Sequence, residues 1–544
     1  MEKPSDRKAR GAFFTPPELA NFITSWAIRS PDDKVLEPSC GEAAFLLPAA
    51  DRLKQLGALE LGFSAQLHGH DIHHDSIKGA EALLSAKGYQ PTLTVGDFFS
   101  QLPDQSFDVV IGNPPYIRYQ NFAGESRSKA LEAALREGVR LNQLASSWAA
   151  FTIHAASFLK KEGRLGLVLP AELLTVKYAS EIRKYLLRRF KSVRLVLFED
   201  LVFPGVLEDV VLLLAEGYGS ADSFEVYQAK NARDLKDRAP EKWQGFRPRD
   251  EEKWTPALLS SQAFSLYEEC ISQGQFEPLS NWGSIYLGAV TGNNKYFTLT
   301  QNEAARLKIP KKDLVKISPP GSRHLRGLVF SDKAWENLAN NGAACYLFSP
   351  SASPSDGAKK YIEMGEATKV NEAYKCKVRS PWWKVPLVNK PDLFFTYMNH
   401  EYPRLVKNSI GAQFLNSLYG LKINSSKKSL GKDLLPIAML NSLSLLGAEL
   451  VGRAYGGGML KHEPKEAIKI PAPSQATIKK VEKELKLVQS RVSGLLRGNN
   501  ISTAVEIVDK IILIDGLGIS EDQVNSLRIS KELLKNRRQS RGKS

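Results

Sequence analysis

The sequence has few cysteines and no long apolar run. Its 544 residues include four cysteines, and no two of them form a Cys-x-x-Cys pair. This spacing predicts neither a disulfide framework nor a zinc site. The first ten residues, MEKPSDRKAR, lack the apolar core of a signal peptide, and no window of about 18 residues is continuously apolar. We therefore expect a cytoplasmic protein without a membrane span, in which the most apolar stretch, 434–452, forms a buried helix.

Acidic side chains are also scarce relative to basic ones. Lys and Arg number 74 against 59 Asp and Glu, which gives a formal net charge of +15. Such a surplus favours a polyanionic partner, either nucleic acid or an anionic membrane surface. A chain of this length contains several domains. Residues 230–253 are charged and poor in apolar periodicity, so we place domains at 1–245, 246–474 and 475–544.

The first domain alternates short apolar runs with segments of helical periodicity. We expect a helix capped by Thr15, and a helix ending at Gly163. The expected strands are 34–37, 66–72, 91–95, 107–112, 164–169, 193–198 and 210–215, and the expected helices between them include 76–86 (capped by Asp75), 148–159 and 179–190. This alternation predicts an α/β domain with a Rossmann-like, largely parallel sheet and helices on both faces.

The rest of the chain has a different pattern of apolar and polar residues. From about residue 276 the apolar segments are short and broken by Gly, Pro, Asn and Ser, which favours an irregular α+β domain. From residue 475 the sequence is helical and strongly basic, and we expect its end, 535–544, to be frayed.

One stretch of the first domain leads from a buried strand into a stiff turn. The apolar run Phe107–Ile111 is followed closely by Asn113, Pro114, Pro115 and Tyr116. The two prolines donate no backbone N–H, and each forces the residue before it out of the helical region. The turn therefore lies at the carboxyl end of a strand, where open α/β sheets bind ligands. Taken alone, the turn also fits a rigid surface loop.

Small and acidic residues follow the earlier strands. Glu37 suits an ammonium group, and Gly41 lets the next loop approach a ligand closely. Asp71 suits the two hydroxyls of a ribose, Asp97 suits an adenine amino group, and Phe98 suits the face of an adenine. A ligand that carries an ammonium, a ribose and an adenine in this order is S-adenosylmethionine.

These motifs together resemble the adenine-N6 DNA methyltransferases of restriction–modification systems, in the Taq-type subgroup with an Asn-Pro-Pro-Tyr motif. The matching stretches are GAFFTPPELANFI, VLEPSCGEAAFL, GHDIHHDSI, GDFF, FDVVIGNPPYIRYQ and LVFPGVLEDVVLLLAEG, over most of residues 10–217. The second half matches more loosely, through YLGAVTGNNKYF, HLRGLVF and YGGGMLKHEPKEAIKIPAP. The resemblance implies a class I methyltransferase domain at 1–245, a target-recognition domain at 246–474 and a helical basic C-terminal region at 475–544.

The resemblance also implies roles for individual residues. The cofactor-binding set is Thr15, Glu37, Pro38, Gly41, Asp71, Ile72, Asp97 and Phe98, and the catalytic set is Asn113, Pro114, Pro115 and Tyr116. The sequence departs from the family at Ala43, where a glycine is usual, and we expect the turn there to differ slightly because alanine does not readily adopt positive φ. No metal is expected.

The turn suits methylation of an adenine amine. The lone pair of N6 is conjugated into the ring, so two acceptors that hold both N6 hydrogens favour the transition state. The Asn113 side-chain oxygen and the Pro114 carbonyl would be those acceptors, held in place before the reaction. Flipping the base out of the duplex costs a few kcal/mol, and stacking on an aromatic ring returns about 1–3 kcal/mol. Tyr116 and Phe203 are the rings that we expect to hold the base.

The second half is expected to bind duplex DNA. Asn293, Asn294 and Lys295 combine amide and basic groups on one predicted loop. Lys461 follows a glycine-rich segment, 455–458, whose backbone could approach a phosphate. We expect a monomer that acts beside a separate cognate restriction endonuclease, if one exists.

Three other functions remain open at this point. Asn-Pro-Pro-Tyr also occurs in methyltransferases that act on ribosomal RNA bases and on protein glutamine. The large basic half disfavours a glutamine substrate but is compatible with RNA. A catalytically silent DNA-recognition subunit is disfavoured by the intact set of residues expected to bind the cofactor.

Overall fold

The computed structural model describes residues 15–59, 62–198, 202–203, 210–235, 242–248 and 253–540. It divides the chain into two compact units, Met1–Leu259 and Ser260–Ser544. The boundary therefore lies after residue 259, and the one expected at residue 245 is wrong. The reason is that 254–259 is bonded to the first unit: the Trp254 N–H donates to the Leu174 carbonyl (2.9 Å), and the Gln228 amide donates to the Leu258 carbonyl (2.9 Å).

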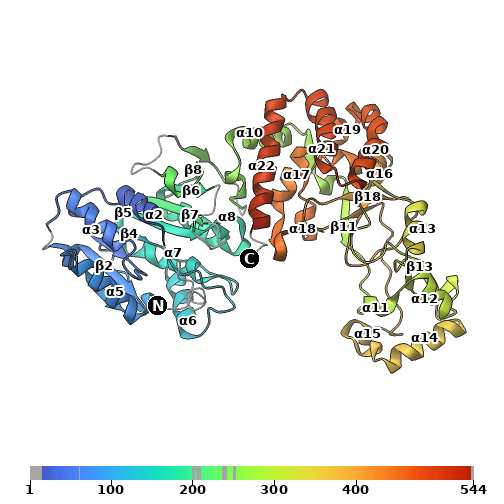
Figure 1. The fold of residues 1–544 in the computed structure, drawn as a ribbon, viewed down its shortest axis with the longest axis horizontal. Helices are drawn as coiled ribbons and strands as arrows, with labels where there is room; N and C mark the ends of the chain where they lie inside the picture. Colours follow the sequence, from blue (N-terminus) through green and yellow to red (C-terminus); the bar gives the residue numbers. More distant parts are fainter. Residues whose placement is uncertain are drawn as a thin grey trace. The chain divides into compact units, whose positions relative to one another are not determined.

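The first unit is built on a nine-stranded sheet (Figure 1) with the order β3-β2-β1-β4-β5-β7-β6-β8-β9. Its strands are β1 (Val35–Glu37), β2 (Leu67–Asp71), β3 (Thr92–Val95), β4 (Phe107–Gly112), β5 (Leu159–Pro170), β6 (Phe190–Phe198), β7 (Val210–Tyr218), β8 (Phe224–Ala229) and β9 (Gln244–Phe246). β7 and β9 pair antiparallel to their neighbours, and the other pairs are parallel. This order confirms the predicted Rossmann-like sheet.

Helices cover both faces of this sheet. They are α2 (Pro17–Ala27), α3 (Leu46–Gln55), α4 (Phe63–Gln66), α5 (His74–Ser85), α6 (Gly124–Arg136), α7 (Ser147–Ser157), α8 (Glu172–Thr175) and α9 (Ser180–Arg189). Val109 and Ile111 of β4 belong to the same buried cluster as the apolar residues of α2 and α3. Because successive side chains alternate across a strand, Val110 points to the opposite face. There, α7 packs on β5 and α9 packs on β6.

Two predicted helix caps are wrong. α2 begins at Pro17 with Pro16 before it, and the Thr15 hydroxyl makes no capping bond because it contacts the side chain of Asn113 instead. α5 begins at His74, so Asp75 lies inside its first turn, where a carboxylate still favours the helix dipole.

The predicted helix stop at Gly163 is also wrong, because this glycine lies inside β5. A Cβ at this position would lie 2.9 Å from Leu159 side-chain atoms and 3.0 Å from the Lys160 carbonyl oxygen. Gly163 therefore allows close packing at the start of the strand.

The second unit, up to residue 474, is an irregular α+β structure, as predicted. A five-stranded sheet has the order β11-β19-β16-β18-β14, two three-stranded sheets have the orders β12-β15-β13 and β17-β21-β20, and β10 pairs with β22. The strands are β10 (Phe276–Pro278), β11 (Gly283–Leu287), β12 (Thr298–Leu299), β13 (Leu314–Lys316), β14 (Val329–Phe330), β15 (Tyr346–Phe348), β16 (Leu393–Phe395), β17 (Met398–Asn399), β18 (Leu405–Asn408), β19 (Tyr419–Ile423), β20 (Arg453–Tyr455), β21 (Met459–Lys461) and β22 (Pro471–Pro473). The helices are α10 (Ser261–Ser272), α11 (Asn294–Phe297), α12 (Gln301–Arg306), α13 (Asp332–Asn340), α14 (Asp356–Ala367), α15 (Tyr374–Lys377), α16 (Lys428–Ala438), α17 (Ser442–Val451) and α18 (Pro464–Ala467).

The C-terminal helices belong to this second unit and form no third domain. They are α19 (Gln475–Lys480), α20 (Glu482–Arg497), α21 (Ile501–Asp509) and α22 (Glu521–Ser540). α22 packs against α10 and α17, and α20 packs against α16, so helices far apart in the sequence share one core (Figure 1). The expectation of a frayed end is wrong up to residue 540, because α22 continues to Ser540 and Arg538 is buried. Residues 541–544 lie outside the described residues.

The apolar stretch 434–452 forms parts of two helices rather than one. The Asn441 side chain accepts a hydrogen bond from the Ser444 N–H (2.9 Å) and so starts α17 directly after α16. Most side chains of this stretch are buried. In the described part of the chain no single helix is long and apolar enough to cross a membrane, and one pair, 425–438 with 442–451, reaches that length and composition only across an 86° bend.

Candidate active site at the carboxyl ends of the strands

The Asn113–Tyr116 turn follows β4 directly. It presents two hydrogen-bond acceptors, the Asn113 side-chain oxygen and the Pro114 carbonyl, that no described donor occupies. The Asn113 side-chain N–H donates to the Thr15 hydroxyl (3.2 Å), which directs Oδ1 of the same amide elsewhere. That Oδ1 is shielded from solvent and has no hydrogen-bond partner. The Asn113 carbonyl accepts from the Ser39 hydroxyl (3.3 Å), and the Pro115 carbonyl accepts from the Ser147 hydroxyl. Within the described residues no donor reaches the Pro114 carbonyl between them.

Tyr116 is held at its far end by the sheet. Its hydroxyl donates to the Val168 carbonyl of β5 (2.9 Å), and its ring packs against the apolar cluster on this face of the sheet. The tyrosine is half-buried, so part of the ring remains accessible. The sheet therefore fixes the ring beside the two acceptors without burying it completely.

Glu37 ends β1 as a buried carboxylate. Its side chain is 1% exposed, and Oε2 accepts from the Leu46 N–H at the start of α3 (2.9 Å). Burial raises the pKa of Glu37 well above its usual range; the backbone donors Leu46 and Phe45 oppose this rise, and nearby Asp71 adds to it. Among the described residues no Lys, Arg or His pairs with this carboxylate. A buried acid without a cation suits a positively charged ligand group.

Asp71 stabilises the loop after β1 by hydrogen bonding to its backbone. Its Oδ2 accepts from the Gly41 N–H (2.9 Å), and its Oδ1 accepts from the His73 N–H (2.9 Å). Gly41 has φ +52°, and a Cβ there would meet nothing within 4 Å, so open space lies beside this glycine. Each carboxylate oxygen keeps a second lone pair for a ligand. Pro38 is buried at the start of the same loop.

Ala43 adopts positive φ despite being an alanine. Its φ is +64°, and its side chain is 1% exposed. Ala43 therefore adopts the positive φ that alanine does not readily take, and the expected small difference from the family's turn stays a prediction. The loop is held from several sides: the Ala43 N–H donates to the Cys40 carbonyl (2.8 Å), and the Cys40 N–H donates to the His70 carbonyl (2.9 Å). These bonds impose a conformation that costs alanine about 1–2 kcal/mol.

Phe98 is a core ring, and the prediction that it offers a face to an adenine is not met. It is 4% exposed, stacks on Phe158 with centroids 5.0 Å apart, and contacts Phe151 and His154. Asp97 is better placed: its Oδ1 caps the following 3-10 turn through the Phe99 N–H (3.0 Å), and its side chain is only half-buried.

His70 lies beside Phe98 and leaves both ring nitrogens without a partner. Burial lowers its pKa, and Asp71 and Asp97 oppose that shift. Ile72, just beyond the end of β2, is 56% exposed and available to a ligand. Across the described residues, no three His, Cys, Asp or Glu side chains are grouped so that they could hold a metal ion.

Phe203 is also buried in this structure. It is 3% exposed and belongs to the apolar cluster that includes Phe198 and Val210. The prediction that its ring is available to stack on a base is therefore not met. The residues on either side of Val202 and Phe203 lie outside the described residues.

The predicted DNA contacts of the second unit have mixed outcomes. Asn293 caps α11, because its Oδ1 accepts from the Tyr296 N–H (3.1 Å), and Asn294 accepts from the Thr291 hydroxyl (2.6 Å). Both amides therefore stabilise their own turn, whereas Lys295 is exposed. The Lys461 ammonium lies 2.9 Å from a Glu463 carboxylate oxygen, so its charge is already paired.

The glycine-rich segment 455–458 is explained in part by packing. A Cβ on Gly458 would lie 2.9 Å from the Gln539 Cα of α22, so this glycine is required by the approach of the helix. Gly456 and Gly457 have open space beside them, and Gly457 has φ +72°. Only these two keep the predicted freedom to approach a phosphate.

Sequence reasoning missed the serines that fix the turn. Ser39 and Ser147 bond to carbonyls far away in the sequence, and no local pattern indicates such contacts. The pair Ser146-Ser147 before an apolar helix indicates a helix start, but not the strand end that it contacts.

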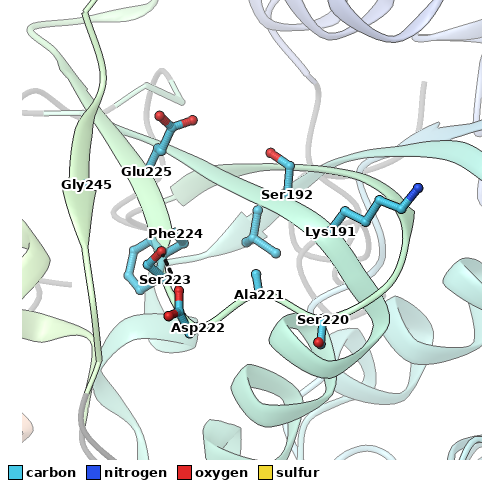
Figure 2. Close-up of a pocket in the computed structure, with 10 residues that line it drawn as sticks. Lys191, Ser192, Ser220, Ala221, Asp222, Ser223, Phe224, Glu225 and Gly245 are labelled. Carbon is cyan, nitrogen blue, oxygen red and sulfur yellow. Dashed lines mark hydrogen bonds between the residues drawn. The ribbon is translucent and has the colours of Figure 1, made fainter.

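A cavity of about 620 Å³ lies elsewhere on the first unit (Figure 2). Its lining comprises Lys191, Ser192, Val193, Ser220, Ala221, Asp222, Ser223, Phe224, Glu225 and Gly245. Lys191 and Phe224 stand at the amino ends of β6 and β8, and β6 runs parallel to β5 and β4. The cavity is therefore at the opposite end of the strands from Asn113.

Comparisons with known proteins agree with this geometry. The N-6 DNA Methylase family matches residues 3–264, and the family of the type II methyltransferase M.Eco57I C-terminal domain matches residues 251–513. The chain is 22% identical to the type II methyltransferase M.AccI of Acinetobacter calcoaceticus over 472 residues, 85% of this chain and 84% of that protein. It is also 22% identical to M.XamI of Xanthomonas campestris pv. amaranthicola over 485 residues, 85% of each chain.

One solved structure shares the fold over nearly the whole chain. It is the type IIL restriction-modification enzyme MmeI in complex with DNA, with a TM-score of 0.52 at 11% identity, over 96% of this chain and 75% of that one. The Rossmann-like sheet and the N-6 DNA Methylase family imply S-adenosylmethionine as the cofactor. The two family models and the type II methyltransferases together support an N6-adenine DNA methyltransferase of a restriction–modification system.

Proposed function

We propose that the chain methylates N6 of an adenine flipped out of duplex DNA, and that the Asn113–Tyr116 turn holds this base. One observation carries the proposal: Asn113 Oδ1 and the Pro114 carbonyl lack donors, while the carbonyls on either side of Pro114 are occupied by Ser39 and Ser147. An amine with two hydrogens supplies the two donors that these acceptors need.

The residues at the ends of β1, β2 and β3 fit S-adenosylmethionine. Glu37 supplies a buried carboxylate without a cation, Gly41 leaves open space, and Asp71 keeps lone pairs for ribose hydroxyls. When bound, this cofactor supplies a methyl group on a positively charged sulfur. Pro38, Ile72 and Asp97 complete the proposed set, and Thr15 contributes by orienting the Asn113 amide. Phe98 supports the site from the core.

The turn would act by positioning. With Oδ1 and the Pro114 carbonyl fixed before the base arrives, no reorganisation is needed as the amine becomes tetrahedral. Tyr116 would stack on the base, and its hydroxyl bond to Val168 holds the ring in place. Stacking on one ring returns about 1–3 kcal/mol of the cost of flipping.

We further propose that the unit Ser260–Ser544 recognises the target sequence in duplex DNA. The net charge of +15 and the type II methyltransferases that the chain resembles support this assignment. The protein would work as a monomer, beside a separate cognate endonuclease where one is present.

The experiment is transfer of a labelled methyl group to duplex DNA, structured RNA and protein. We expect N6-methyladenine in DNA alone; label in RNA or on glutamine, with none in DNA, would assign one of the other substrates. Asn113→Ala should lower the rate of transfer at least about 100-fold while cofactor affinity changes little. The control is Asn142→Ala, because Asn142 is exposed and its side chain accepts from the neighbouring Leu144 N–H (2.8 Å). Loss of cofactor binding in Asn113→Ala would instead assign the turn a structural role.

A further inference from the structure

Ser147, the first residue of α7, is bonded to the turn from outside it. Its hydroxyl donates to the Pro115 carbonyl and accepts from the Ile117 N–H (2.8 Å). Its own N–H donates to the Ile117 carbonyl (3.0 Å). Three hydrogen bonds therefore join one serine to the residues immediately before and after Tyr116.

The Ser147 hydroxyl makes no hydrogen bond within its own helix. Both of its hydrogen bonds lead to the turn, and the preceding residue, Ser146, occupies the N-cap position of α7. The residue is 1% exposed, so water does not replace these bonds if the hydroxyl is removed. The contact is therefore made by a buried side chain whose partners lie about thirty positions earlier in the sequence.

We infer that Ser147 is a positioning residue for methyl transfer, which fixes the Tyr116 ring and keeps the Pro114 carbonyl available. The ring is held at its backbone by Ser147 and at its hydroxyl by Val168, so its direction is set from both ends. By occupying the Pro115 carbonyl, Ser147 also leaves the Pro114 carbonyl as the acceptor that lacks a donor. This inference rests on the proposed role of the Asn113–Tyr116 turn.

Removal of the hydroxyl should affect the rate more than binding. A displacement of about 1 Å in a positioning group can lower the rate about 100-fold. We expect Ser147→Ala to lower the single-turnover rate at saturating cofactor and DNA by about 10- to 100-fold. Cofactor Kd, DNA Kd and Tm should stay close to those of the control variant.

The matched control is Ser157→Ala on the same helix. Ser157 is 4% exposed, and its hydroxyl donates to the His154 carbonyl (2.6 Å), so this variant also removes a buried hydroxyl from α7 but none that contacts the turn. Ser147→Gly is the second test variant, in case alanine prevents folding, and the same loss of rate is expected.

Equal single-turnover rates in Ser147→Ala and Ser157→Ala would overturn the inference, as would a loss of rate explained by weaker binding of cofactor or DNA. Asn113→Ala separates this outcome from failure of the proposed function. If Asn113→Ala abolishes transfer and the Ser147 variants do not, only the positioning role fails. If Asn113→Ala transfers at the normal rate, the role of the turn itself fails.

Discussion

Glu37 combines deep burial with the absence of a cationic partner among the described residues, so cofactor binding at this carboxylate should depend on pH. Its pKa is raised by burial, so the carboxylate takes up a proton at a higher pH than an ordinary glutamate. Only the charged form attracts a cation. We therefore expect cofactor affinity to weaken as pH falls through this raised pKa, which calorimetric titrations at a series of pH values would measure.

Glu37→Gln should remove this pH dependence and weaken cofactor binding by about 10- to 100-fold. The same raised pKa means that the charged carboxylate costs the free protein stability, since stability is present below the unfolded pKa and lost as pH rises through the folded one. The Tm of free Glu37→Gln should therefore equal or exceed that of the wild type near neutral pH. Glu42→Gln, an exposed change in the same loop, is the control, and an equal pH profile for both variants would contradict this account.

For single residues, the sequence located the polar side chains at the strand ends. It did not predict which aromatic rings are buried in the core. Glu37, Asp71 and Asn113 each lie at or just after the end of a strand of the central sheet. Phe98 and Phe203 were predicted from their neighbours in sequence, but both rings are covered by residues that come together only in the fold. No local pattern distinguishes an aromatic ring at a ligand from one in the core.

Among the elements, the loop between β1 and α3 offers a test at Ala43, which is buried with φ +64°. Ala43→Gly relieves about 1–2 kcal/mol of strain but loses a buried methyl and gains unfolded-state entropy, each about 0.5–1 kcal/mol. We expect its free energy of unfolding to stay within about 1 kcal/mol of the wild type. Ala43→Val should cost about 2 kcal/mol or more, because a β-branched side chain tolerates positive φ poorly.

Denaturant unfolding of the first unit is the measurement for both variants. Ala44→Gly, at the exposed neighbouring position, shows the cost of adding a glycine to this loop without relief of strain. Stability of Ala43→Val equal to that of Ala43→Gly would mean that the loop relaxes out of positive φ.

The strands were easier to predict from the sequence than the helix caps. Apolar runs located the buried parallel strands β1, β2 and β4 within a residue or two, because such a strand has few alternatives. The cap predicted for α5 failed because the helix begins at His74, before Asp75, and that of α2 failed because the Thr15 hydroxyl contacts a residue 98 positions away rather than its own helix. Local capping preferences do not include such a long-range partner.

For the whole molecule, the net charge of +15 implies that DNA affinity falls as salt rises. Lys295 is exposed, whereas Lys461 is paired with Glu463. We expect Lys295→Ala to reduce the slope of log affinity against log salt by about 1, and Lys461→Ala to change it by less than about 0.5. Titration of labelled duplex at several salt concentrations measures both, and equal slopes for the two variants would contradict the assignment of Lys295 to a phosphate.

The sequence placed the second unit's boundaries wrongly for a reason that appears only at the scale of the whole chain. Residues 475–540 look like a basic appendage when taken alone, but α22 packs against α10 and α17 across long sequence separations. At its end, the Arg538 guanidinium donates to Glu449 (2.7 Å from Nη2 to Oε1), to the Gly458 carbonyl and to the His400 carbonyl (3.2 Å). The charged side chains of this pair are 4% and 5% exposed.

Arg538→Ala tests whether the C-terminal helix is part of the second unit's core. It leaves the Glu449 carboxylate buried without its partner, which costs about 3–5 kcal/mol. Burial already raises the pKa of Glu449 and Arg538 opposes that shift, so removing the arginine should make the loss of stability largest at neutral pH and smaller in acid, where the carboxylate is protonated.

Arg538→Met combined with Glu449→Leu should recover most of the lost stability, because no buried charge remains. Lys510→Ala, which breaks an exposed pair with Asp515, should change stability by less than about 0.5 kcal/mol. Denaturant unfolding of the second unit measures the stability of all three variants. An Arg538→Ala variant as stable as Lys510→Ala would mean that α22 is not part of the core of this unit.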